Sequence, residues 1–241
     1  MKILALLAHP DDETILCGGT IDKLVKKNHE VHVSFFTNND QAYFASEKQK
    51  VRILRTKLEG KASSKLLGFQ VNFLDFVDME LQKDKGRLIQ ATMGEIRRVK
   101  PDLIITHHIK DKHIDHRTLG EVIPEANFQS GCKLCGGETQ WSATVILQGE
   151  VDLEMTTPFE SQVISAISSE NVANKLAAFS CYASVKDEHK TSQDWLMSKI
   201  KSCLALRGNT AGASYGEAFQ VSSYTPISAS GTKLLTTILE E

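Results

Sequence analysis

The sequence predicts an α/β fold: a single domain in which a mostly parallel, Rossmann-like sheet carries helices on both faces. Three observations indicate this. Short apolar runs alternate with segments of helical periodicity, the runs are apolar at nearly every position, and the chain of 241 residues is long enough for one core. Alternation of this kind gives parallel strands joined by right-handed crossovers.

The first half of the chain supplies the regular part of the pattern. The expected strands are Lys2–Ala8, Glu30–Thr37, Val71–Phe76 and Leu103–Thr106. The expected helices between them are Thr14–Lys27, Ser46–Leu67 and Arg87–Lys100. Gly68 stands where a C-cap glycine belongs, and Pro101 ends the third helix.

The second half is less regular. The expected elements there are the strands Val145–Val151 and Ala218–Ser222 and the helices Glu170–Tyr182 and Ser192–Leu206. The segment Ser222–Gly231 is rich in Ser and reads as a linker. We therefore expect one domain over residues 1–221 and a C-terminal tail over residues 222–241.

Composition excludes several classes of partner. Hydrophobic residues make up 41% and charged residues 24%, which is typical of a globular protein. The net charge of −2 gives no electrostatic basis for binding nucleic acid or an anionic membrane. The apolar run Ile3–Ala8 is too short to span a bilayer and lacks the features of a secretory signal. We expect a cytoplasmic protein without a membrane span, and the sequence leaves a homo-oligomer open.

The five cysteines do not form a recognisable metal or disulfide framework. Cys132 and Cys135 have the spacing of metal ligands, but a closed zinc ribbon needs a second such pair, which the sequence lacks. Reduced thiols in a loop are the expectation for this pair.

Two polar clusters carry the chemistry, and each follows an expected buried strand. The first is His9-Pro10-Asp11-Asp12-Glu13, and the second runs from Thr106 to His116 and holds four of the eight histidines. In the common doubly wound order, the first and fourth strands are neighbours, and ligands bind beyond their carboxyl ends. The two clusters are therefore expected to face one another across one crevice.

Imidazole and carboxylate ligands without cysteine suit a catalytic divalent metal, with zinc first and Fe²⁺ as the alternative. Asp11 and Asp12 leave one turn in different directions, so one can bind metal while the other acts as a base. His113 and His116 would share one face of a helical turn, where one can bind metal while the other meets a developing oxyanion. Alone, the first cluster also fits a turn with a helix cap, and the second fits a solvated loop.

At these residues the sequence resembles the LmbE-like (PIG-L) superfamily of zinc-dependent N-acetylglucosaminyl deacetylases. The stretch AHPDDETILCGGT (Ala8–Thr20) is similar to the first signature of that family, and PDLIITHHIKDKHIDHRTLGE (Pro101–Glu121) is similar to the second. Weaker similarity extends through Lys175–Ser184 and Tyr215–Phe219. The likeness thus marks residues 1–221 as an LmbE-like deacetylase domain.

The resemblance implies a role for each residue of the two signatures. His9, Asp12 and His116 would bind zinc, and Asp11 would be the general base that takes a proton from the attacking water. His113 would be the cationic group that stabilises the oxyanion, and Asp115 would hold a histidine in orientation.

Some positions depart from the family pattern. Ile114 stands where the family commonly has proline, and Arg55 precedes Glu59 by four residues instead of three. Whether Arg55 or Arg207 contacts substrate therefore stays open.

The expected function is hydrolysis of a linear amide, which removes an N-acetyl group from an N-acetylglucosamine-type amino-sugar derivative. Two alternatives remain. One is a zinc amidase acting on a thiol–sugar conjugate or another acylated amine, and the other is a non-catalytic sugar- or nucleotide-binding module. The sugar itself and the pathway are not predictable from these residues.

Overall fold

A seven-stranded sheet forms the centre of the protein. The computed structural model describes residues 1–41, 49–133, 139–185, 193–224 and 227–239. The strands are β1 (Lys2–Leu7), β2 (Glu30–Phe35), β3 (Gln70–Phe73), β4 (Leu103–His107), β5 (Val145–Gly149), β6 (Val163–Ala166) and β7 (Gly216–Val221). Their order is β3-β2-β1-β4-β5-β7-β6. Pairing is parallel from β3 to β5, and β7 pairs antiparallel with both β5 and β6. The predicted α/β fold with a mostly parallel sheet is confirmed.

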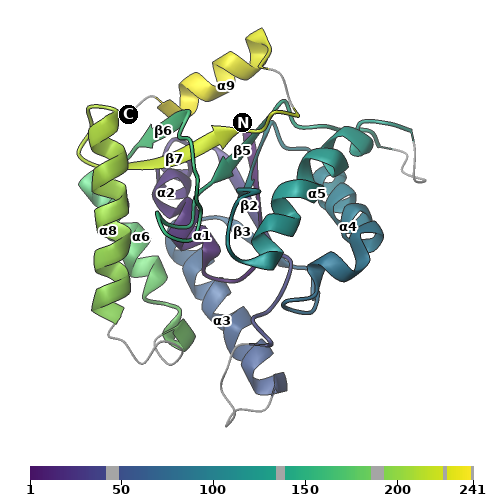
Figure 1. Ribbon diagram of the computed structural model, residues 1–241, viewed down its shortest axis with the longest axis horizontal. Coiled ribbons are helices and arrows are strands. Elements are labelled where there is room, and N and C mark those ends of the chain that lie inside the picture. Colours follow the sequence, from purple (N-terminus) through teal and green to yellow (C-terminus); the bar gives the residue numbers. More distant parts are fainter. Residues whose placement is uncertain (42–48, 134–138, 186–192, 225–226, 240–241) are drawn as a thin grey trace.

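Helices cover both faces of the sheet (Figure 1). They are α1 (Asp12–Leu16), α2 (Gly18–Lys26), α3 (Gln49–Leu67), α4 (Lys85–Val99), α5 (Ile114–Ser130), α6 (Ser169–Phe179), α8 (Gln193–Thr210) and α9 (Ala229–Leu239), with a short 3₁₀ turn, η1 (Leu81–Asp84), before α4. Helices α4 and α5 pack on one face, and α1, α2, α3 and α6 pack on the other. Helix α8 lies outside α6 and contacts β7.

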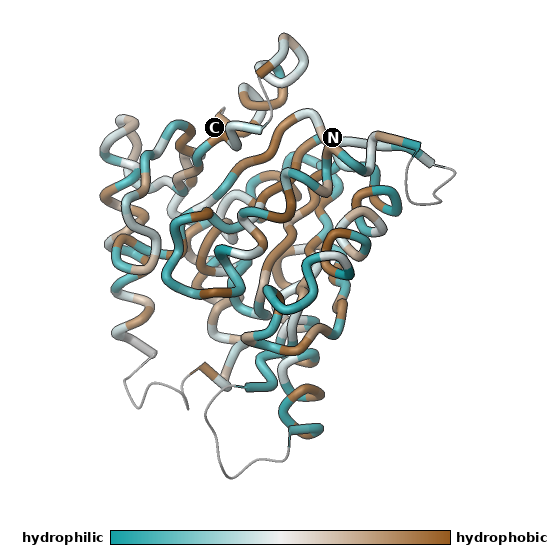
Figure 2. The backbone as a smooth tube through the Cα atoms, turned by 45° about the vertical axis from the view of Figure 1, so that its right-hand side comes forward, coloured by the Kyte–Doolittle hydropathy of each residue, from teal (hydrophilic) through white to brown (hydrophobic). Residues whose placement is uncertain are grey.

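Strand β1 shows why the expected strands are apolar throughout. Ile3, Ala5 and Leu7 belong to the cluster of buried residues under α1 and α2, whereas Leu4 and Leu6 belong to the cluster under α4 and α5. Both faces of the strand are therefore shielded from water, so its sequence does not alternate between apolar and polar residues. Figure 2 shows the hydrophobic strands gathered at the centre of the molecule.

Several elements differ from expectation: α5, η1 and α9 were not among the expected helices. The helix expected over Thr14–Lys27 is broken at Cys17, whose backbone (φ −145°, ψ 17°) separates α1 from α2. Strand β6 was not expected, because its four residues carry too few alternating positions to separate a strand from a loop.

Helix α3 forms where it was expected, although the expected start at Ser46 lies outside the described residues. Its apolar positions are exposed to solvent: Val51, Leu54 and Leu58 have exposed fractions of 52%, 60% and 58%. The helix instead buries a polar face that includes Glu59 and Ser63.

The C-terminal segment contains a helix that packs on the body of the protein. Helix α9 contacts β6, and Ile238 is fully buried among the core residues under α1 and α2. The ammonium group of Lys23 donates a 2.7 Å hydrogen bond to the Ile238 carbonyl. Across the described ranges, no helix has both the length and the apolar character needed to cross a membrane.

Candidate metal centre

The two polar clusters meet because their strands are neighbours. Strands β1 and β4 pair in parallel, and His9 follows the end of β1 while His116 lies in the first turn of α5 beyond β4. The Nδ1 atom of His9 is 3.1 Å from the Nε2 atom of His116, although 107 residues separate them in the chain. The predicted meeting of the two clusters at one edge of the sheet is confirmed.

Asp12 adds a carboxylate to the two histidine nitrogens, with one oxygen near each ring. Its Oδ2 lies 3.3 Å from His9 Nδ1, and its Oδ1 lies 3.4 Å from His116 Nε2. All three side chains are buried. In a tetrahedral site with metal–ligand bonds of about 2.0–2.1 Å, the ligand atoms stand about 3.3–3.4 Å apart. The three contacts, two of which involve different oxygens of Asp12, are close to that spacing.

The outward nitrogen of each ring is bound to carboxylates. His9 Nε2 lies 3.0 Å from Asp78 Oδ1 and 3.4 Å from Asp115 Oδ2, and His116 Nδ1 lies 3.0 Å from Asp111 Oδ1. A ring that donates its N–H to a carboxylate presents a lone pair at its other nitrogen. Two lone pairs therefore face each other at 3.1 Å, an arrangement that requires a proton or a cation between them.

The pKa shifts of His9 and Asp12 also indicate a site that favours positive charge. Burial opposes charge on His9, but hydrogen bonds to Asp115, Asp12 and Asp78 raise its pKa well above the ordinary value. Burial likewise opposes charge on Asp12, but the positive charges of His116 and His107 hold its pKa well below the usual range. The surrounding carboxylates thus favour positive charge at this position, which a bound divalent cation in place of the protons would supply.

Three overlapping groups of described side chains have the spacing of metal ligands. They are His9 with His113 and His116; Asp12 with His107 and His116; and His9 with Asp78, His113 and Asp115. His9 and His116 each occur in two of them. The donor set of imidazole nitrogens and carboxylate oxygens fits zinc or iron(II).

Asp11 has an unusual backbone conformation. It is the N-cap of α1 with φ +122° and ψ −28°, a region that side-chain-bearing residues rarely adopt. Its N–H donates to Glu13 Oε2 at 3.1 Å, and the Ser63 and Tyr182 hydroxyls donate to Glu13 Oε1 at 2.6 Å each. Strain of this kind is retained where the surroundings over-determine it, typically at functional sites. The buried Glu13 network holds the turn that carries Asp11.

His113 caps the N-terminus of α5. Its Nδ1 accepts a 3.2 Å hydrogen bond from the Asp115 N–H, so a neutral ring carries its proton on Nε2. Burial and the positive charges of His9 and His116 lower the pKa of His113 to about 4. These influences favour the neutral ring in the metal-free protein.

Two residues of the site carry no signal in the sequence. Asp78 follows β3 in the loop before η1, away from both polar clusters, and reaches His9 only through the fold. Thr156 donates to Asp111 from the segment between β5 and β6. A single carboxylate or hydroxyl in a loop gives no pattern that a sequence reading could recognise.

The remaining candidate residues are placed as follows. Arg55 pairs with Glu59 at 3.3 Å, and Arg207 forms a two-pronged ion pair with Glu150. Cys132 is a free thiol, and Cys135 lies outside the described residues.

Comparison with known proteins identifies one matching family, described as GlcNAc-PI de-N-acetylase (PIG-L), over residues 4–127, just over half of the chain. This region contains both polar clusters.

Two curated relatives align with about half of the chain. A probable N-acetyl-alpha-D-glucosaminyl L-malate deacetylase 2 from Bacillus cereus is 29% identical over 137 residues, 52% of this chain and 60% of the relative. A 4-oxalmesaconate hydratase from Pseudomonas putida is 26% identical over 132 residues, 52% of this chain and 51% of the relative. The chain thus spans between half and three-fifths of the curated relatives it matches.

Solved structures share the fold over nearly the whole chain. The N,N'-diacetylchitobiose deacetylase from Pyrococcus horikoshii has a TM-score of 0.79 at 22% identity and covers 92% of this chain and 84% of its own. The 4-carboxy-2-hydroxymuconate hydratase from Pseudomonas putida has a TM-score of 0.77 at 20% identity and covers 91% of this chain and 95% of its own.

Proposed function

Because the chain belongs to the PIG-L family of GlcNAc-PI de-N-acetylases, we propose that it is a metal-dependent hydrolase that removes the N-acetyl group from an N-acetylated amino-sugar derivative. The observation that carries the proposal is the convergence of His9, Asp12 and His116, from two strands, to pairwise separations of 3.1–3.4 Å.

These three residues would hold the metal, with zinc as the first choice and iron(II) as the second. A bound divalent cation supplies Lewis-acid chemistry, which polarises the amide carbonyl and makes a nucleophile available from water near pH 7. Asp78, Asp115 and Asp111 would fix the orientation and tautomer of the two histidine ligands.

Asp11 would act as the general base. Its carboxylate takes one proton from the attacking water, the new C–O bond forms, and the C–N bond then breaks as the same proton passes to the leaving nitrogen. The products are acetate and a free amino sugar. The strained turn and the buried Glu13 network would hold Asp11 in place through these steps.

His113 would stabilise the oxyanion, as the family resemblance implies. With Nδ1 accepting from the Asp115 N–H, its Nε2–H is free to stabilise the oxyanion of the tetrahedral intermediate. Asp115, which contacts both His9 and His113, would hold these histidines in orientation.

The relatives support the chemistry only in part. Deacetylases occur among both the curated relatives and the structural neighbours, but so do hydratases of unsaturated acids. Since one fold serves both reactions, the substrate must be tested directly. Hydrolysis of an amide in a thiol–sugar conjugate would use the same site.

The experiment measures metal content and product formation together. Zinc-loaded protein is incubated with N-acetylglucosamine derivatives, including a malate glycoside and a thiol conjugate, and acetate and free amine are quantified. Stoichiometric release of both products, lost on chelation and restored by zinc, is the expected result. The matched variant Asp11→Asn should retain metal and lose activity by at least about 100-fold. Hydration of an unsaturated diacid without any deacetylation would overturn the proposal.

A further inference from the structure

A cavity with mainly apolar walls opens beside Asp11. Its apolar side chains come from α1, α6, α8 and two connecting segments: Ile15, Val151, Phe179, Val185, Leu196 and Ile200. The rest of the lining is Asp11, the candidate base, and an ion pair in which Lys199 Nζ lies 2.9 Å from Asp152 Oδ2. The cavity has a volume of about 110 Å³.

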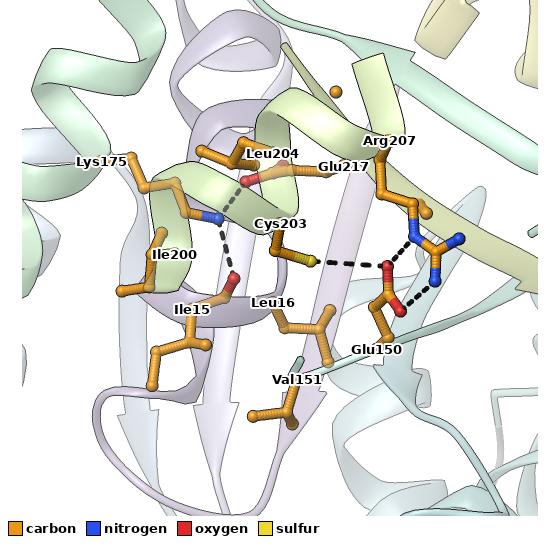
Figure 3. A pocket seen from close by; sticks show the side chains of 12 residues that line it. Ile15, Leu16, Glu150, Val151, Lys175, Ile200, Cys203, Leu204, Arg207 and Glu217 are labelled. Carbon is orange, nitrogen blue, oxygen red and sulfur yellow. Dashed lines mark hydrogen bonds and ion pairs between the residues drawn. The ribbon is translucent and has the colours of Figure 1, made fainter. Parts of the chain in front are cut away.

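A smaller cavity with a different lining adjoins this one. The two share Ile15, Val151 and Ile200. Figure 3 shows the smaller cavity, in which Lys175 is bonded to Glu217 and Arg207 is bonded to Glu150. The larger cavity is therefore apolar apart from Asp11 and one ion pair, and the charged groups of the smaller cavity lie beyond the shared apolar residues.

We propose that the apolar cavity binds the acyl chain of the substrate, and that the preferred acyl group is longer than acetyl. This inference rests on the proposed function. The carbonyl carbon must lie within one water molecule of Asp11, because that carboxylate takes a proton from the attacking water. The cavity is lined by Asp11, so one substituent of the amide can extend from the carbonyl group into it. The acyl chain is the apolar substituent and the sugar is the polar one, so the apolar side chains of the cavity fit the acyl chain.

The walls favour an alkyl chain over a polar group. Ile15 and Leu196 are only half-buried in the protein alone, and a chain lying against them would remove further apolar surface from water. The charged pairs of the smaller cavity already satisfy one another, and an alkyl chain that reached them would displace their polar surroundings without replacing them. Binding should therefore improve with chain length up to these charged groups and then decline.

The test compares N-acetyl-, N-hexanoyl- and N-dodecanoylglucosamine as substrates for zinc-loaded protein. The expected kcat/KM for the hexanoyl substrate exceeds that for the acetyl substrate by at least about tenfold, or about 1.4 kcal/mol. The dodecanoyl substrate should be slower than the hexanoyl one. A hexanoyl-to-acetyl ratio of one or below would overturn the proposal.

A matched pair of variants tests whether the preference for the hexanoyl substrate depends on this cavity. Leu196→Trp fills the cavity from α8 and should bring the hexanoyl-to-acetyl ratio close to one. Leu206→Trp makes the same change at a position of the same helix that is 46% exposed and lies outside both cavities, and it should keep the wild-type ratio. Equal ratios in the two variants would contradict the assignment. If Leu196→Trp does not fold, Leu196→Phe replaces it.

A binding measurement separates this inference from the proposed function. Calorimetry on zinc-loaded protein should show hexanoate binding at least about tenfold more tightly than acetate, with the difference lost in the Leu196 variant. If no acylated sugar is hydrolysed but hexanoate is preferred, the proposed function fails and the acyl cavity stands. If acetyl groups are hydrolysed and hexanoate is not preferred, the acyl cavity fails and the proposed function stands.

Discussion

The hydroxyl of Thr156 donates a 2.7 Å hydrogen bond to Oδ2 of Asp111, 45 residues before it in the chain. The other oxygen of Asp111 lies 3.0 Å from Nδ1 of His116. Thr156 also accepts a 3.0 Å hydrogen bond from the Val151 N–H. The loop after β5 thus holds the carboxylate that orients a candidate metal ligand.

Removing that hydroxyl should weaken metal binding. Thr156→Val leaves Asp111 Oδ2 without its buried donor, and loss of an outer partner of this kind typically lowers metal affinity by about 10–100-fold. Competition with a chromophoric chelator measures the change. Thr156→Ser keeps the hydroxyl and should stay within about threefold of wild type; an equal loss in both variants would mean that the methyl group, and not the hydrogen bond, is responsible.

Asp78 should be required for full metal affinity. Asp78→Asn removes the charged acceptor from His9 Nε2, which lies 3.0 Å away, and weakens the lone pair at Nδ1. We expect an affinity loss of about 10–100-fold in the same competition assay. The control is Asp75→Asn in the same loop, since that carboxylate contacts Lys57 and Asn38 instead of His9. Unchanged affinity in Asp78→Asn would remove Asp78 from the site.

Glu13 should make stability depend on pH. Burial is the largest influence on Glu13 and raises its pKa from 4.5 to about 7, so the folded protein keeps this proton after the unfolded chain has lost it. Below pH 4.5 Glu13 is protonated in both the folded and the unfolded protein, so it does not change the free energy of unfolding. Between pH 4.5 and 7 the free energy of unfolding falls as pH rises, by up to about 3 kcal/mol in total. Above pH 7 the contribution of Glu13 no longer changes with pH.

Urea unfolding of the metal-free protein at pH 5 and pH 7.5 measures this dependence. Glu13→Gln cannot ionise, so its free energy of unfolding should fall less between the two pH values than that of wild type. Glu170→Gln, at a side chain that is 75% exposed, should follow wild type. The same pH dependence in wild type and Glu13→Gln would show that Glu13 keeps an ordinary pKa.

Much of the fold follows from local pattern. Strands shielded on both faces by helices must be apolar throughout, so β1 and β4 are recognisable, and their adjacency predicts that His9 and His116 meet. The break at Cys17 and the four-residue strand β6 depend on tertiary packing and leave no periodic signal.

Helix α3 shows why burial is harder to predict than helix formation. Its inward face carries Glu59, which accepts hydrogen bonds from Ser184, and Ser63, which donates to Glu13. Partners more than 40 residues away make these polar groups acceptable inside the protein, and a local apolar pattern contains no information about them. Asp78 escapes prediction for the same reason.

The most direct test of the central claim is the metal content of purified variants by elemental analysis. The account predicts about one zinc or iron per wild-type chain, and loss of that metal in both His9→Ala and His116→Ala, which belong to different clusters but share one site. His29→Ala, a histidine remote from the site, should retain the metal. Full metal content in either the His9 or the His116 variant would contradict the claim that the two clusters bind one cation.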